Sequence, residues 1–117
     1  MTSVVIPWRS GCPYRQRALV WVLGRWAERF PTFDVVLGVH DDGPWCKAAA
    51  VADGLSKVAD GALILADADV WPLRPEALTV AVGALSDHGW AIPHGDVQRL
   101  TETASEAFMA DQPLPPR

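Results

Sequence analysis

Charged and aromatic side chains follow three short apolar runs of this sequence, at the point where each run ends. The first run leads into Pro7-Trp8-Arg9, the second into Asp41-Asp42-Gly43, and the third into Asp67-Ala68-Asp69. Four carboxylates held close together repel one another strongly unless a cation joins them. Oxygen ligands favour Mg²⁺ or Mn²⁺ over zinc, and Mg²⁺ commonly combines one or two carboxylates with substrate phosphates. These residues therefore predict a Mn²⁺ or Mg²⁺ site that takes a phosphorylated substrate.

The elements that must position these residues alternate between strands and helices. The apolar runs lack polar alternation, which is typical of strands buried in a parallel sheet. Between them, apolar residues recur at helical spacing. This order predicts an α/β fold, a mostly parallel sheet covered by helices on both faces as a three-layer sandwich. The expected strands are Ser3–Pro7, Asp34–His40, Ala62–Ala66 and a fourth at Trp90–Pro93. The expected helices are Tyr14–Phe30, Trp45–Val58, one that begins at Pro75 and one capped by Thr101.

The three chemical groups should meet, because parallel strands end at the same edge of a sheet and ligands bind beyond that edge. We call residues 7–9, 41–43 and 67–69 the strand-end rim. Taken alone, Asp41-Asp42-Gly43 more often forms a turn or caps a helix. An Asp-x-Asp sequence alone is also a weak signal. An Asp-x-Asp directly after an apolar strand, with strand-Asp-Asp-Gly one helix earlier, is more specific.

Three segments, Val4–Pro7, Val39–Gly43 and Leu63–Val70, together resemble the nucleotide-sugar half of a GT-A glycosyltransferase, in the manner of glycosyltransferase family 2. The resemblance covers roughly residues 3–86. It implies a Rossmann-like GT-A (nucleotide-diphospho-sugar transferase) fold, truncated after the donor half. It also implies metal-dependent transfer of a sugar from a UDP- or GDP-sugar donor to an unknown acceptor, with Mn²⁺ or Mg²⁺ as cofactor.

The resemblance assigns roles to the acidic residues that follow the third strand. Asp69 would bind the metal that bridges the donor diphosphate. Asp67 would contact the ribose, or the metal through water. His94 is a candidate for a further metal ligand, although a lone histidine after a strand is more often a surface residue.

The resemblance also assigns a nucleotide-binding set. Asp42, with Asp41 as the alternative, would accept a hydrogen bond from the base. Lys47 matches the basic residue of a family pattern in the helix before the Asp-x-Asp strand. In that pattern Asp53 stands where asparagine is usual. The nucleoside pocket would be lined by Pro7, Trp8 and Arg9, with Arg9 near phosphate.

The chain is short for such an enzyme, because only 48 residues follow Asp69. The candidates for a catalytic base among them are Asp96, Glu102 and Glu106. A second copy could supply the missing wall, so a homo-oligomer is expected, with Trp21, Trp71 and Trp90 as candidate contacts.

Two other functions stay open. One is a noncatalytic nucleotide-sugar-binding module. The other is a haloacid-dehalogenase-like phosphatase, with Asp67 as nucleophile and Asp69 as acid. That phosphatase family expects Gly-Thr soon after the pair, where Val70-Trp71-Pro72 stand here.

Size and composition limit the classes of protein to which this chain can belong. The 117 residues predict one domain, residues 1–110, followed by a Pro-rich tail, residues 111–117. Fourteen acidic against ten basic residues give a net charge of −4, which argues against nucleic-acid binding. No apolar run approaches the roughly 20 residues that a membrane-spanning helix needs. Two cysteines make no disulfide framework, and we expect a cytoplasmic protein.

Overall fold

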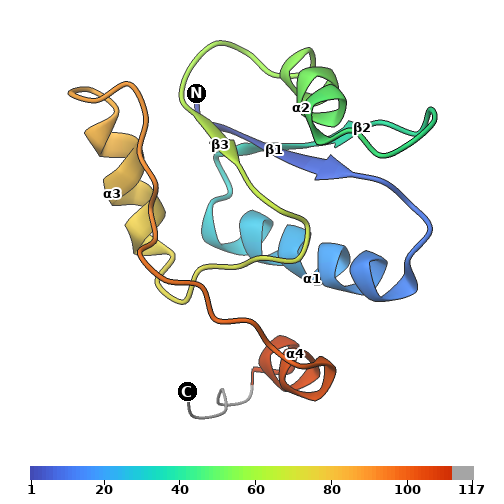
Figure 1. Ribbon diagram of the computed structural model, residues 1–117. Coiled ribbons are helices and arrows are strands. Elements are labelled where there is room, and N and C mark those ends of the chain that lie inside the picture. The colour runs from blue at the N-terminus through green and yellow to red at the C-terminus, as the bar shows by residue number, and fades with distance from the viewer. Residues whose placement is uncertain (112–117) are drawn as a thin grey trace.

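A computed structural model describes residues 1–111, so the predicted tail lies, apart from Asp111, outside the described residues. The described residues form an α/β fold with a three-stranded parallel sheet and four helices (Figure 1). In chain order the elements are β1 (Ser3–Trp8), α1 (Pro13–Arg29), β2 (Asp34–Val39), α2 (Lys47–Leu55), β3 (Leu63–Leu65), α3 (Glu76–Ala84) and α4 (Glu102–Met109).

The sheet has the strand order β2-β1-β3, with Val4 of β1 opposite Val35 of β2 and Ile64 of β3. The chain moves from β1 outward to β2 and then back across β1 to β3. Right-handed connections would place the two intervening helices on opposite faces of the sheet. Figure 1 shows this arrangement, with α2 above the sheet and α1 below it. The predicted covering of both sheet faces is therefore confirmed.

The larger core lies between the sheet and α1. Alternate residues of β1 turn toward α1, because successive side chains of a strand point to opposite faces. The buried residues of α1 recur at helical spacing and meet them, as the sequence predicted. This cluster consists of Val4, Ile6, Trp8, Leu19, Val22, Trp26, Ala68 and Leu78.

On the other face, α2 lies unusually close to the sheet because two glycines meet there. A Cβ on Gly38 of β2 would overlap the carbonyl oxygen of Ala50, and a Cβ on Gly54 would overlap Cγ1 of Val5. The sequence predicted a small inner face for α2, and this close approach confirms it. The helix begins two residues later than expected, at Lys47, because the residue before it, Cys46, is extended.

The predicted fourth strand at residues 90–93 is wrong. Those residues form no strand, and the side chains of Trp90 and Ile92 are 75% and 62% exposed. A fourth strand beside β3 would have only three residues to pair with, because β3 is three residues long. Pro93 also has no backbone N–H to donate to such a pairing. The predicted last helix is confirmed as α4, where the Oγ1 of Thr101 accepts a hydrogen bond from the N–H of Ala104 at 3.1 Å.

No helix within residues 1–111 combines the length and the apolar character that crossing a membrane requires.

Candidate functional site

Arg9 joins the end of β1 to the loop between β2 and α2. Its Nη2 donates a hydrogen bond to the carbonyl oxygen of Gly43 at 2.6 Å, and it lies 3.5 Å from that of Asp41. Gly43 has a φ of +69°, in the left-handed region that glycine adopts without strain. The first two groups of the strand-end rim therefore meet, as the parallel sheet predicted.

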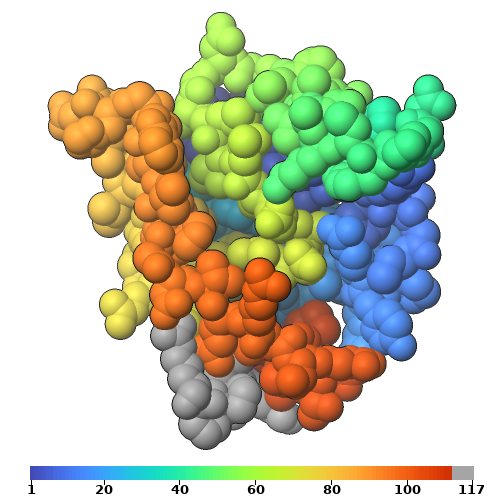
Figure 2. All heavy atoms as spheres, in the orientation of Figure 1, coloured from blue at the N-terminus to red at the C-terminus, as the bar shows by residue number. Residues whose placement is uncertain are grey.

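Lys47 joins the start of α2 to the end of β3. Its Nζ lies 3.2 Å from Oδ1 of Asp67 in an ion pair whose side chains are 62% and 54% exposed. In Figure 2 the yellow-green residues after β3 lie against the green start of α2. The third group of the rim is thus tied to the start of α2, the helix that follows the second group. An exposed ion pair contributes little to stability, so its charges remain open to a ligand.

The Asp-x-Asp sequence is held in place by its middle residue. Ala68 is 1% exposed within the core, whereas Asp67 and Asp69 on either side of it are exposed. Within residues 1–111, Asp69 makes no hydrogen bond or ion pair, and neither does the side chain of Asp42. A strand end that buries one small residue between two aspartates therefore leaves a free carboxylate at the rim.

Asp67 and Asp69 are the carboxylates that the sequence predicted to hold Mn²⁺ or Mg²⁺. The described residues contain no group of three or more His, Cys, Asp or Glu placed to hold one ion. His94 is therefore not gathered with Asp67 and Asp69. A two-carboxylate set suits Mg²⁺ or Mn²⁺ when phosphate oxygens and water complete the shell. That Asp67 and Asp69 bind a metal stays a prediction.

The residues at the end of β1 contribute unequally to the rim. Pro7 is buried, and Trp8 is 7% exposed within the core between the sheet and α1. Both present little surface to a nucleoside, and their place in its pocket stays a prediction. Arg9, which is only half-buried, supplies the polar atoms of this segment.

Asp53 contacts Val39 and Lys57, two partners that the sequence did not reveal. Its Oδ2 accepts a hydrogen bond from the N–H of Val39 at 2.8 Å and lies 2.9 Å from Nζ of Lys57. Lys57 also donates to the carbonyl oxygen of Leu37 at 2.9 Å. The hydrogen bond from Lys57, and then that from Val39, lowers the pKa of Asp53. Together the two side chains satisfy backbone groups of β2, which is an edge strand of the sheet.

The late acidic candidates lie in other surroundings. Glu106 of α4 forms an ion pair with Arg17 of α1 at 2.8 Å. Figure 1 places α1 between the sheet and α4, so neither Glu106 nor Glu102 reaches the rim. Asp96 accepts a hydrogen bond from the N–H of Val97 at 3.0 Å, a local turn contact.

Two of the three candidate contact tryptophans are used within the chain. Trp21 donates its Nε1–H to the carbonyl oxygen of Met109 at 3.0 Å and packs against Phe108. Trp71 packs edge-on against Trp26, with ring centroids 5.1 Å apart. Trp90 alone of the three is largely exposed, so it is the one free for an intermolecular contact.

The chain matches no protein-family model, and comparisons with curated proteins and with solved structures likewise give no match.

Proposed function

We propose that the strand-end rim binds the diphosphate of a UDP- or GDP-sugar together with Mn²⁺ or Mg²⁺, and that the chain transfers the sugar to an acceptor. The observation that carries the proposal is a pair of contacts: Arg9 joins the end of β1 to the loop after β2, and Lys47 joins the start of α2 to Asp67 after β3. These contacts set two cations and the unpaired carboxylate of Asp69 at one edge of the sheet. In open α/β sheets that edge is where nucleotides bind.

The charges of the rim suit a diphosphate. Asp69 and Asp67 would hold the metal, which would supply Lewis-acid stabilisation of the leaving diphosphate. Lys47, already 3.2 Å from Asp67, would place a positive charge beside the same phosphates. In the transfer, an oxygen of the acceptor hydroxyl forms a bond to the anomeric carbon. The bond from that carbon to the diphosphate oxygen breaks, and the electron pair leaves with the diphosphate. The hydroxyl proton passes to a base.

A second function, nucleotide-sugar binding without transfer, is favoured by one specific observation. Glu102 and Glu106 lie on α4, across α1 from the sheet, and Glu106 is already paired with Arg17. Neither is positioned to take the proton of an acceptor at the rim. Unless Asp96 takes that proton, a chain with this arrangement would bind the donor and leave the catalytic base to another subunit or lack one.

A homo-oligomer is part of the same proposal. β3 ends the sheet, and Leu65 on it is 58% exposed. An unpaired strand edge of this kind invites association with another chain. The mass of the protein in solution, measured by light scattering, tests this point separately from nucleotide binding.

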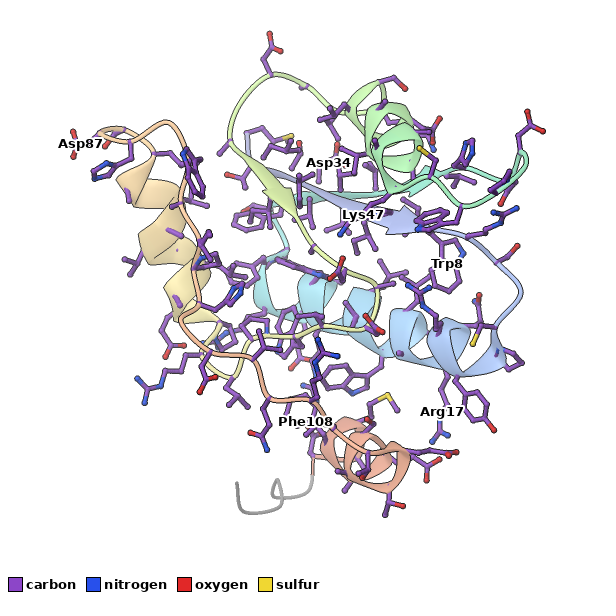
Figure 3. All side chains as sticks on the ribbon, viewed as in Figure 1. Trp8, Arg17, Asp34, Lys47, Asp87 and Phe108 are labelled. Atoms are coloured by element: carbon purple, nitrogen blue, oxygen red, sulfur yellow. The ribbon has the colours of Figure 1, made fainter. Side chains whose placement is uncertain are left out.

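Calorimetry tests the donor site. UDP, GDP, UDP-glucose and GDP-mannose are titrated into the protein with and without Mn²⁺. We expect at least one to bind more tightly with Mn²⁺, and we expect Asp69→Ala to lose that enhancement. The matched control is Asp87→Ala, since Asp87 is an exposed acid in the turn after α3, far from Lys47 in Figure 3.

The outcomes separate the candidate functions. Release of UDP or GDP in the presence of an acceptor supports transfer, and binding without release supports the noncatalytic module. Hydrolysis of a simple phosphate ester that Asp67→Asn abolishes would favour the phosphatase. Absence of metal-enhanced binding to all four nucleotides would refute the donor site.

A further inference from the structure

Two hollows among the described residues lie away from the rim, on the side of α1 that α4 covers. One has a volume of about 410 Å³, within the range of roughly 300–1,000 Å³ typical of small-molecule sites. A second, of about 430 Å³, shares the walls formed by Trp21 and Arg25. We call the two together the aromatic groove. It uses no residue that the proposed donor site needs.

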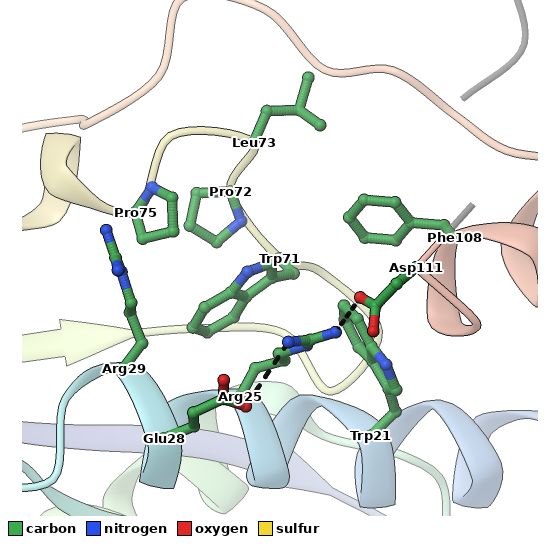
Figure 4. Close-up of a pocket in the computed structure, with 10 residues that line it drawn as sticks. All are labelled: Trp21, Arg25, Glu28, Arg29, Trp71, Pro72, Leu73, Pro75, Phe108 and Asp111. Carbon is green, nitrogen blue, oxygen red and sulfur yellow. Dashed lines mark hydrogen bonds and ion pairs between the residues drawn. The ribbon is translucent and has the colours of Figure 1, made fainter. Parts of the chain in front are cut away.

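Three aromatic rings form the apolar part of this groove: Trp21, Trp71 and Phe108 (Figure 4). All three are half-buried, so part of each side chain is exposed. Trp71 is braced by the core through Trp26, with ring planes 86° apart. The indole N–H of Trp21 already donates to Met109. The rings therefore offer rigid aromatic surface with no unsatisfied polar atom on Trp21.

The charged part of the groove is balanced. It contains two arginines, Arg25 and Arg29, and two acids, Glu28 and Asp111. Arg25 lies 4.8 Å from the centre of the Trp21 ring and forms ion pairs with both Glu28 and Asp111 (Figure 4). Arg29 pairs with Glu76 at 3.9 Å, so each charged group of the wall already has a partner of opposite sign. No unpaired charge therefore favours an anion or a cation as the ligand. A purely apolar ligand would leave four charged groups against hydrocarbon.

A neutral carbohydrate matches both parts of the lining. One face of a pyranose ring carries mainly C–H bonds, whose weakly positive hydrogens suit the negative face of an aromatic ring. Its hydroxyl groups both donate and accept hydrogen bonds, and planar guanidinium and carboxylate groups supply the matching partners. We infer that the aromatic groove binds a neutral sugar ring through stacking on Trp71 and hydrogen bonds to Glu28 and Arg29.

The groove adjoins the rim along the chain. Trp71 follows Asp69 by two residues, and two residues of extended chain span at most about 7 Å. The groove and the rim are thus joined through residues 69–71. If the proposed transfer is correct, the ligand of the groove is the acceptor, and that role alone depends on the proposed function. Carbohydrate binding itself does not.

Binding is tested with three named probes, cellotriose, maltotriose and triacetylchitotriose, by calorimetry at up to millimolar concentrations. We expect saturable binding of at least one. Trp71→Ala should weaken it about tenfold, the effect of losing one aromatic stacking contact in a polar solvent. The matched control is Trp90→Ala, which removes a tryptophan that is 75% exposed and lies outside the groove, and it should leave binding unchanged.

Since Trp71 also braces the core, two exposed positions keep the test independent of folding. Glu28 and Arg29 have side chains that are 72% and 57% exposed, so Glu28→Ala and Arg29→Ala should fold normally and still weaken binding. No saturable binding of any probe overturns the inference. So does binding that both variants leave unchanged, or a dimer that forms through this groove while no sugar binds.

Parallel titrations with UDP and Mn²⁺ separate this inference from the donor site. Nucleotide binding without sugar binding refutes the sugar site in the groove and supports the donor site at the rim. Sugar binding without nucleotide binding supports the sugar site in the groove and refutes the proposed transfer reaction.

Discussion

An alanine at Gly54 would force α2 away from the sheet. The added Cβ would overlap Cγ1 of Val5 and would lie 3.3 Å from Cα of Gly38. Val5 is fully buried, so its side chain has no open space into which it can turn. The helix itself must shift, and with it Lys47, which pairs with Asp67 at the rim.

The expected size of the effect follows from two opposing contributions. Overpacking a buried site costs about 1–3 kcal/mol, and we take about 3 because both neighbours are fixed. Replacing glycine by alanine inside a helix returns about 1 kcal/mol. The net loss is about 2 kcal/mol in the free energy of unfolding. For a chain slightly above 100 residues this lowers Tm by about 8 °C.

Gly24→Ala is the matched control, because Gly24 is also a glycine inside a helix but a Cβ there meets nothing within 4 Å. It should raise the free energy of unfolding by about 1 kcal/mol. Urea unfolding of both variants measures the difference, about 3 kcal/mol, which isolates the close approach of α2. If Gly54→Ala proves as stable as Gly24→Ala, α2 does not pack on β1 as described.

Three further predictions concern single contacts. Asp53 has a lowered pKa in the folded protein, so its carboxylate stabilises the fold above its unfolded-state pKa of 3.8, and this contribution disappears as pH falls through the folded value. Asp53→Asn should therefore show a shallower loss of stability on acidification, measured by urea unfolding across the acidic range; an unchanged slope would contradict the Lys57 and Val39 contacts. Thr101→Ala should destabilise α4 by about 1 kcal/mol because it removes the N-cap of that helix. Amide exchange within α4 should become faster. Thr79→Ala is the control, because Thr79 lies inside α3 and caps no helix, and it should leave the exchange of α4 unchanged. Lys47→Ala should change the free energy of unfolding by less than about 1 kcal/mol, because its ion pair is exposed, while weakening UDP binding about tenfold; a large loss of stability with unchanged binding would reverse that assignment.

The parts of the fold that the sequence predicted correctly are those set by local pattern. The apolar runs of β1, β2 and β3 and the helical spacing of α1 each identify an element without reference to the rest of the chain. The side-chain cap at Thr101 is equally local. Parallel pairing alone predicted that the strand ends meet; the contact of Arg9 confirms this for the first two, and Lys47 of α2 contacts Asp67 of the third.

The parts that could not be predicted depend on distant partners. Residues 90–93 have strand-like composition, yet a strand exists only where a neighbour offers a ladder, and β3 is too short to offer one. The pairing of Glu106 with Arg17 joins positions 89 residues apart, so the sequence could not show that this acid is occupied. The role of Lys57 depends on which backbone groups of β2 lie at the edge of the sheet.

The central claim is that the three segments of the strand-end rim bind one divalent cation together with a nucleotide diphosphate. Mn²⁺ is paramagnetic and broadens the NMR signals of nearby amides, so it reports its own position. With UDP or GDP present, Mn²⁺ should broaden the amides of residues 8–9, 41–43 and 67–69 together, and Asp69→Ala should abolish the effect. Broadening confined to other parts of the chain, or identical broadening in Asp69→Ala, would contradict the account.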